Sequence, residues 1–195
     1  MLTPEGFKRD KRVLRRVLPD VPSVQAINLQ GSSGNLGSSG KFCVEIGVYF
    51  PAIAQLTASL RWHAMPALEK AAAYDGHIRL RVNHLLPEQR ESWWLPYMDR
   101  RRDLWFDVSS EHDLGDLREV LARMLREYVV PWLRLRATPE AMIIDKAGDL
   151  PERVAALISL GNADAARVLY AAEKKDIKHD AEAIERWFEG VCGSQ

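Results

Sequence analysis

Apolar and polar residues alternate in the first half of the chain, which is the spacing of β-strands with one buried face. The alternation is clearest over residues 41–50, with Phe42, Val44, Ile46, Val48 and Phe50 on one face and Lys41, Cys43, Glu45, Gly47 and Tyr49 on the other. Residues 24–30 alternate as well, and the stretch between, 31–40, consists almost wholly of Gly, Ser and Asn. This arrangement predicts a β-hairpin with a long tip.

Two later segments keep the period of two and predict further strands. Residues 77–85 place Ile78, Leu80 and Val82 inward and His77, Arg79, Arg81 and Asn83 outward. Residues 103–109 place Leu104, Phe106 and Val108 inward and Trp105 and Asp107 outward. Near the N-terminus, residues 8–18 fit a helix and a strand equally well, because Val13, Leu14, Val17 and Leu18 suit either periodicity.

The second half of the chain changes to the helical period of 3.6 residues. From Asp113 onward a wide apolar stripe predicts a long helix through Leu117, Val120, Leu121, Met124, Leu125, Tyr128 and Trp132. Pro131 lacks a backbone donor and should kink this helix or begin a new segment. One short helix is expected to start at Pro51, a second to cover residues 66–74, and three or four more to follow Pro139.

Together these elements predict an α+β fold. Residues 1–136 should form a four-stranded, mainly antiparallel sheet with helices packed on one face, and residues 137–195 a helical extension docked on it. Within the extension, residues 155–173 resemble one helix-turn-helix unit of a repeat protein. A single unit cannot bury its own apolar face, so we expect it to pack against the main domain.

Several of these segments resemble a known family. They are Gly6-Phe7-Lys8 with the basic stretch after it, Ile27-Asn28-Leu29-Gln30 with the Gly/Ser loop after it, the strand from Phe42 to Val48, and the later His77-Ile78-Arg79 and Trp105-Phe106. Over about residues 6–135 the chain resembles the bacterial domain-of-unknown-function family 4304. The resemblance implies an α+β fold. It brings no assigned activity and no functional residues.

Composition and charge narrow the function classes. The 195 residues carry no formal net charge, which argues against general nucleic-acid binding, although basic residues gather in residues 1–18. Two cysteines are too few for a disulfide framework or a zinc site, and five histidines lack metal-ligand spacing, so we expect neither metal nor cofactor. With no leader-like segment and no apolar run near the ~18 residues of a membrane span, we expect a cytoplasmic protein.

Catalytic motifs are weak in this sequence. The Gly-Lys pair at positions 40–41 resembles the end of a phosphate-binding loop, but Phe42 stands where Ser or Thr would bind magnesium and a strand follows in place of a helix. The Gly-x-Ser-x-Gly turn of many serine hydrolases is absent from the sequence. We therefore expect a protein without catalytic activity rather than an enzyme.

The polar face of the predicted sheet is the best candidate for a functional surface. Since alternate side chains of a strand share a face, one surface should carry Asn28, Gln30, Glu45, Tyr49, Arg79, Arg81, Trp105 and Asp107. The simpler interpretation is a solvated face with cross-strand ion pairs, each worth less than ~1 kcal/mol when exposed.

The sequence thus favours a non-catalytic bacterial binding module whose protein partner contacts this polar face and the hairpin tip. One alternative is an enzyme of an unrecognised class, with Glu45, Asp107 and the arginines lining a pocket. The other is a nucleic-acid-binding protein that uses Trp93, Trp94 and the arginines at 100–102. Convergence of the polar side chains below the surface would favour the enzyme, and a flat arrangement in solvent the binding module.

Overall fold

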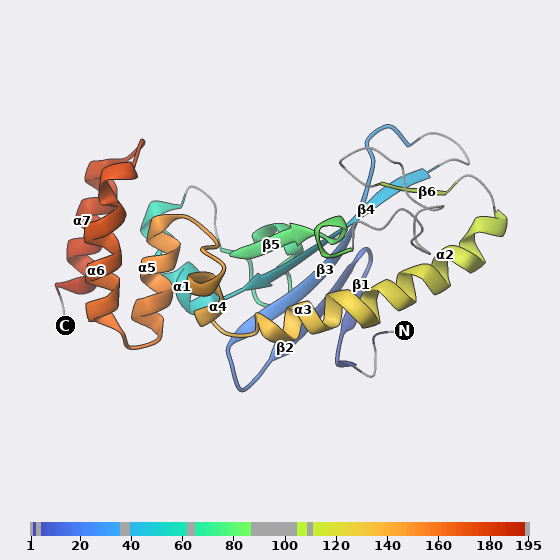
Figure 1. Cartoon of the computed structure of the whole chain (residues 1–195), viewed down its shortest axis with the longest axis horizontal. Helices are drawn as coiled ribbons and strands as arrows, with labels where there is room; N and C mark the ends of the chain where they lie inside the picture. The colour runs from blue at the N-terminus through green and yellow to red at the C-terminus, as the bar shows by residue number, and fades with distance from the viewer. Residues whose placement is uncertain are drawn as a thin grey trace.

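The alternating segments form one antiparallel sheet in the computed structural model, which describes residues 2, 5–35, 40–61, 65–86, 105–108 and 111–193. Its strands are β1 (Lys8–Asp10), β2 (Val13–Leu18), β3 (Ser23–Gly31), β4 (Gly40–Tyr49), β5 (Ile78–Arg81) and β6 (Phe106–Val108). The strand order is β1-β2-β3-β4-β5, and β6 pairs with β4 (Figure 1). The predicted α+β class is confirmed, while the predicted count of four strands is wrong: the described residues form six.

The extra strands come from the N-terminal segment that periodicity could not assign. β1 and β2 form a hairpin whose turn contains Lys11 in the left-handed region, at φ 52°. β2 then pairs with β3 from Val13 opposite Asn28 to Leu18 opposite Ser23. Pairing with the neighbouring strand therefore decides a conformation that the local sequence leaves open.

Strands β5 and β6 lie end to end along the same side of β4. Arg81 at the end of β5 pairs with Glu45, and Phe106 at the start of β6 pairs with Phe42. β5 is shorter than predicted. β5 gives way to a 3-10 turn, η4 (Val82–Leu85), and positions 103, 104 and 109 of the predicted fourth strand lie outside the described residues.

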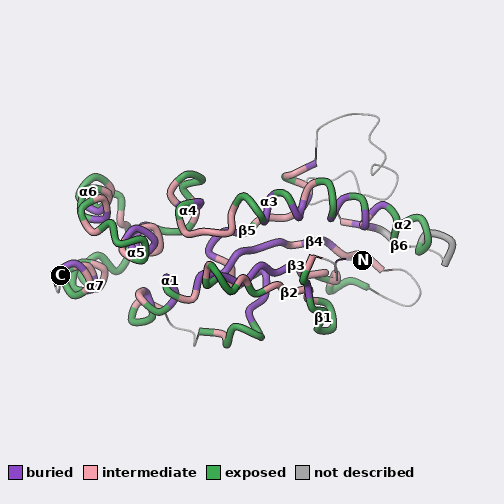
Figure 2. Tube along the Cα trace, turned by 90° about the horizontal axis from the view of Figure 1, so that it is seen from below, coloured by how far each residue is buried: buried purple, intermediate pink, exposed green. Residues whose placement is uncertain are grey.

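One face of the sheet is covered by the long helical stretch that the 3.6-residue stripe predicts (Figures 1 and 2). It consists of α2 (Glu111–Met124), a π-helical turn η6 (Leu125–Val129) and α3 (Val130–Leu135). Pro131 is in the first turn of α3, where a missing backbone donor is tolerated, and the π turn precedes it. The predicted disturbance at Pro131 is thus confirmed as a change of helix type.

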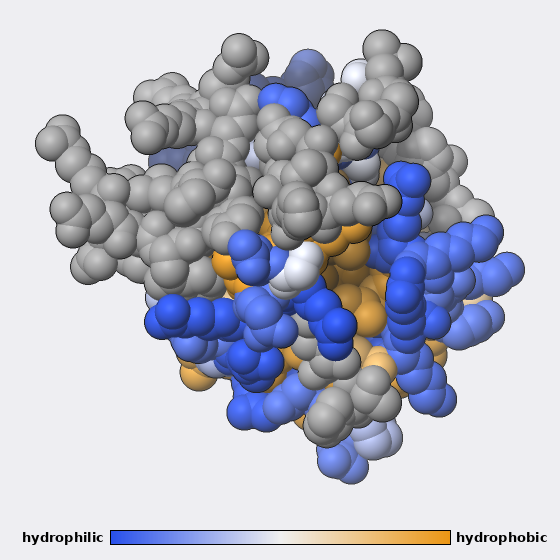
Figure 3. Space-filling view, turned by 90° about the vertical axis from the view of Figure 1, so that its right-hand side faces the viewer, coloured by the Kyte–Doolittle hydropathy of each residue, from blue (hydrophilic) through white to orange (hydrophobic). Residues whose placement is uncertain are grey.

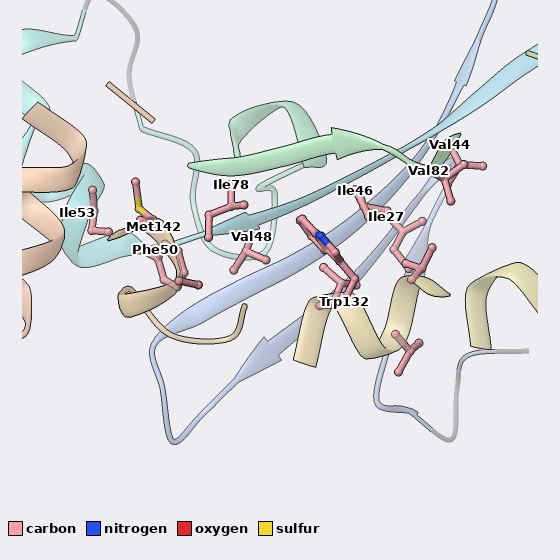
Figure 4. Packing of buried hydrophobic residues seen from close by; sticks show 14 of the residues in the cluster. Ile27, Val44, Ile46, Val48, Phe50, Ile53, Ile78, Val82, Trp132 and Met142 are labelled. Carbon is pink, nitrogen blue, oxygen red and sulfur yellow. The ribbon is translucent and has the colours of Figure 1, made fainter. Parts of the chain in front are cut away.

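The core lies between this helical stretch and the sheet (Figure 4). Trp132 of α3 lies against the sheet among Ile27, Ile46 and Val48. The side chain of Gln25, which is 0% exposed, ties the two layers together. Its Nε2 donates to the carbonyl oxygen of Leu133 at 2.6 Å, and its Oε1 accepts from Nε of Arg16 at 3.0 Å.

The C-terminal residues form four helices at one end of the molecule (Figure 1). They are α4 (Glu140–Ile144), α5 (Leu150–Ser159), α6 (Ala163–Glu173) and α7 (Ala181–Cys192), and α5 packs against α1 (Pro51–Leu56) and α6. Asp149 caps α5 with a capping box to Glu152, and Asn162 caps α6 by accepting from the amide of Ala165 at 3.1 Å. Trp187 of α7 donates from Nε1 to the carbonyl oxygen of Leu56 at 2.7 Å.

The face of the sheet opposite α2 and α3, which we call the outer sheet face, carries residues 65–76, which we call the covering segment. Part of the structure of this segment was predicted wrongly. A helix was expected over residues 66–74, but the chain there is extended and turned, with a short 3-10 helix η3 (Ala73–Asp75). Arg15 holds this segment on the sheet by donating from Nε to the carbonyl oxygen of Ala71 at 2.6 Å. Ala71, Ala72 and Ala73 are buried as a result. This long-range contact prevails over the helical propensity of alanine.

Among the described residues, no helix is long and apolar enough to cross a membrane.

Candidate functional site

Some residues of the predicted polar face lie side by side on three neighbouring strands. Asn28 on β3, Glu45 on β4 and Arg81 on β5 are aligned by the strand pairing. Nε of Arg81 lies 3.8 Å from Oε1 of Glu45, and its guanidinium carbon lies 5.8 Å from the ring centroid of Trp105. The continuity of β5 and β6 along β4 explains this last contact, because Trp105 directly precedes β6.

Two of the other predicted residues, Tyr49 and Gln30, are not brought to this row. Tyr49 is only 3% exposed and packs with Val24, Ala54 and Ala71 beneath the covering segment. Gln30 is exposed two positions along β3, where its Oε1 accepts from the thiol of Cys43 at 3.6 Å. The side chain of Asp107, and the whole of 87–104 with Trp93, Trp94 and the arginines at 100–102, lie outside the described residues.

A shallow hollow of about 250 Å³ opens where the covering segment meets β5. Its polar lining comes from Glu45, Tyr74, Arg79 and Arg81, and we name it the Tyr74 hollow. Tyr74 is 61% exposed, and Arg79 donates from its guanidinium to the carbonyl oxygen of Tyr74 at 3.1 Å. Three of the eight predicted site residues, Glu45, Arg79 and Arg81, thus line one hollow with an exposed aromatic side chain that was predicted to lie in a helix.

A larger cleft of about 820 Å³ adjoins this hollow, and Tyr74 and Arg79 line both. The cleft lies between the end of the 3-10 helix η2 (Ala58–Leu60), the start of β5 and the turn before α5. Arg61 donates to Oε1 of Glu152 across it at 2.6 Å. Both side chains are largely buried, with 27% and 20% exposed, so this ion pair joins the sheet side to the C-terminal helices.

Burial shifts the proton affinities of two cleft residues. Burial, together with the nearby Asp149, raises the pKa of Glu152, and the charge of Arg61 opposes the shift. Burial, and then the charge of Arg61, lowers the pKa of His77 to about 3. His77 is therefore neutral at physiological pH. Its Nδ1 accepts from the amide of Phe50 at 3.1 Å, which places the ring proton on Nε2.

The Nε2 of His77 is a buried donor with no hydrogen-bond acceptor in the part of the chain that the structure describes. Such a donor costs free energy unless a partner satisfies it. The described lining of the cleft offers carboxylates, guanidinium groups and this imidazole, and contains no Ser, Thr or Cys. No group of three or more His, Cys, Asp or Glu suited to a metal ion occurs among the described residues. The arrangement is suited to holding polar or charged groups.

Sequence reasoning missed the cleft because its residues are far apart along the chain. The Asp149 to Glu152 spacing is that of a capping box and marks the start of α5, but it carries no sign of Arg61, 91 positions earlier. His77 was expected on the outward face of a strand, and it is 5% exposed instead. No feature of the sequence indicated that Tyr74 is exposed, because its exposure depends on how residues 65–76 lie across the sheet.

A comparison with protein families gives one match, which covers residues 1–135 and is described as Domain of unknown function (DUF4304). The chain belongs to this family. The matched part contains the whole sheet and the residues of the Tyr74 hollow, whereas Glu152 lies beyond it. No curated protein matches the chain, and no solved structure matches it either.

Proposed function

We propose that this protein is a non-catalytic bacterial binding module that contacts a protein partner through the outer sheet face at the Tyr74 hollow. The observation that supports this most directly is the clustering of Tyr74, Arg79, Arg81 and Glu45 around one shallow opening. Tyr, Trp and Arg are the side chains that most often dominate the energy of protein interfaces. Trp105, beside Arg81, adds a further residue of this kind.

The dimensions of the hollow agree with this role. At about 250 Å³ it is smaller than most small-molecule sites and suits one inserted partner side chain. Met65, which lines the adjoining cleft together with Tyr74 and Arg79, is 40% exposed, so apolar contact area is available near these polar residues. Methionine, aromatic residues and arginine are enriched at interfaces.

We further propose that the module acts in the bacterial cytoplasm. Its two cysteines, Cys43 and Cys192, are buried thiols on separate elements, and cytoplasmic proteins keep such thiols reduced.

The proposal is tested by quantitative affinity capture from the native cell. The bait carries Tyr74→Ala with Arg79→Glu, and a matched control carries Val168→Ala with Arg186→Glu on α6 and α7, far from the hollow along the chain. We expect a protein that is captured by the wild-type and control baits and reduced about tenfold or more by the hollow variant. Equal capture by both variants, or no protein that distinguishes the wild-type bait from empty resin, would contradict the proposal.

One observation favours a second candidate, an enzyme or receptor for a small polar molecule. The 820 Å³ cleft lies in the size range of ligand sites, and it combines the unsatisfied Nε2 of His77 with the raised pKa of Glu152. Under this alternative, Glu152→Gln abolishes turnover or binding of a cell metabolite, detected by mass spectrometry of an extract incubated with the protein. Any protein capture through the Tyr74 hollow should be the same for Glu152→Gln and the wild type.

The nucleic-acid alternative has a separate signature. Binding through the arginines at 100–102 and the tryptophans at 93 and 94 would weaken steeply as salt rises, because it depends on counterion release. Binding of single-stranded nucleic acid that is absent, or that does not change with salt, removes this alternative.

A further inference from the structure

An apolar groove opens at the end of the molecule opposite the C-terminal helices, between α2 and the sheet. Its volume is about 630 Å³. The sheet contributes Leu14, Leu29, Phe42, Val44 and Val108, the helical stretch contributes Leu114, Leu117, Leu121 and Leu125, and Leu2 and Phe7 come from the N-terminal segment. We name it the α2 groove. Leu114 at its edge is 53% exposed, and an apolar hollow flanked by hydrophilic side chains is visible at this end (Figure 3).

Four cationic side chains complete the described lining of the α2 groove. Arg9, Lys11 and Arg12 come from the β1–β2 hairpin, and Arg118 comes from α2. The described lining contains no Asp or Glu. Within the described ranges none of the four forms an ion pair, whereas the neighbouring Arg15 pairs with Asp10 at 3.0 Å. Arg15 is thus paired and holds the covering segment on one face of the sheet, whereas the cations of the hairpin that line the groove lie toward the other face.

We propose that the α2 groove binds an aliphatic carboxylate with a single hydrocarbon chain. The chain lies among the leucines of α2 and the apolar side chains of the sheet, and the carboxylate is held by Arg12 and Arg118 at the edge. This site is on the face of the sheet opposite to the Tyr74 hollow, so the inference is independent of the proposed protein contact.

Charge and shape both select this class of ligand. Arginine binds a carboxylate with strong, often bidentate, hydrogen bonds, and four cations in a described lining without Asp or Glu create a positive potential at the opening. The groove volume lies in the range of small-molecule sites, which suits one chain better than the two chains of a membrane phospholipid. Leucine side chains from four positions of the helical stretch favour a flexible aliphatic chain over a charged or polar body.

The test is calorimetric titration of the full chain with octanoate, decanoate and dodecanoate, each below its micelle concentration. Burying one more methylene should strengthen binding about fourfold, so each step of two carbons should lower the Kd about fifteenfold until the groove is filled. Dodecanol and methyl dodecanoate, which carry no charge, should bind at least about tenfold more weakly than dodecanoate.

Variants localise the binding. Arg12→Glu with Arg118→Glu should weaken dodecanoate binding about tenfold or more, while Arg126→Glu, an exposed residue of the following π turn that does not line the groove, should leave it unchanged. Urea unfolding confirms that each variant is folded. Absence of dodecanoate binding, equal binding of dodecanoate and dodecanol, or equal weakening by Arg126→Glu would overturn the proposal. A groove already closed by the protein's own chain would give the first of these results.

Discussion

Gly47 on β4 lies directly beneath Ala73 of the covering segment, so closely that a Cβ atom on Gly47 would collide with the carbonyl oxygen of Ala73. At this contact the covering segment lies directly on the sheet, whereas Glu45 and Arg81, farther along, line the Tyr74 hollow. The position of the Tyr74 hollow therefore depends on a residue that has no side chain.

Replacing Gly47 by alanine should destabilise the protein by about 1–3 kcal/mol, because the obstructing atom belongs to the backbone and cannot rotate away. Gly115→Ala is the matched control. Gly115 lies in α2 with open space around its Cα, so alanine there should be neutral or stabilising by up to about 1 kcal/mol. Urea unfolding measures both variants, and similar effects of the two substitutions would contradict the close contact.

His77 should make the protein sensitive to acid. Burial lowers its pKa from 6.5 to about 3, so below pH 6.5 the unfolded chain binds a proton that the folded protein does not. This contribution to stability is complete above pH 6.5 and is lost as the pH falls toward 3. The loss amounts to about 3 kcal/mol at pH 4. His77→Asn keeps an acceptor for the amide of Phe50 and removes the titration. Urea unfolding between pH 7 and pH 4 should show a smaller loss for the variant, and parallel curves would refute the neutral, buried imidazole.

Glu152 should act with the opposite sign. Burial raises its pKa above the ordinary 4.5, so the folded protein holds a proton that the unfolded chain releases. Stability attributed to this group is present below pH 4.5 and decreases as the pH rises through the folded-state pKa. Glu152→Gln preserves the capping box of α5. The wild type should therefore lose stability relative to the variant as the pH rises from 4 to 7. A relative gain would mean that attraction to Arg61 dominates.

The indole of Trp187 should hold the C-terminal helices on the rest of the chain. We propose that residues 137–195 form an extension docked on residues 1–136, and Trp187 is 7% exposed and bonded to the carbonyl of Leu56. Trp187→Phe should cost about 1 kcal/mol through the lost hydrogen bond, and Trp187→Ala about 3–5 kcal/mol. Hydrogen exchange should accelerate in α7 and α1 of the alanine variant. Val168→Ala, at a position 71% exposed on α6, should change neither.

Much of the fold was predictable because burial imposes a period on the sequence. The β3–β4 hairpin, the helix after Pro51 and the helical stretch through Trp132 follow from alternation or from a 3.6-residue stripe. The secondary structure of two segments could not be predicted, for a common reason. Residues 8–18 carry no decisive local pattern, and residues 66–74 carry a misleading one, so each takes its conformation from a distant partner: β3 in the first case, Arg15 and the sheet in the second.

The candidate site was predictable in part. Strand periodicity correctly places Glu45, Arg79 and Arg81 on one face, and the pairing of β4 with β5 brings them together. Periodicity alone does not show that Tyr49 on the same face is buried, because the covering segment comes from elsewhere in the chain. The cleft required Arg61 and Glu152 to meet across 91 positions, which depends on how α5 packs against α1.

Photo-crosslinking in the native cell tests the proposed protein contact most directly. A benzophenone amino acid in place of Arg79 probes the Tyr74 hollow, and the same amino acid in place of Val168 probes an exposed position on α6. We expect a discrete crosslinked protein from position 79 that disappears when Tyr74→Ala is added, and no such product from position 168. Identical products from both positions, or a product from position 79 that persists with Tyr74→Ala, would contradict the account.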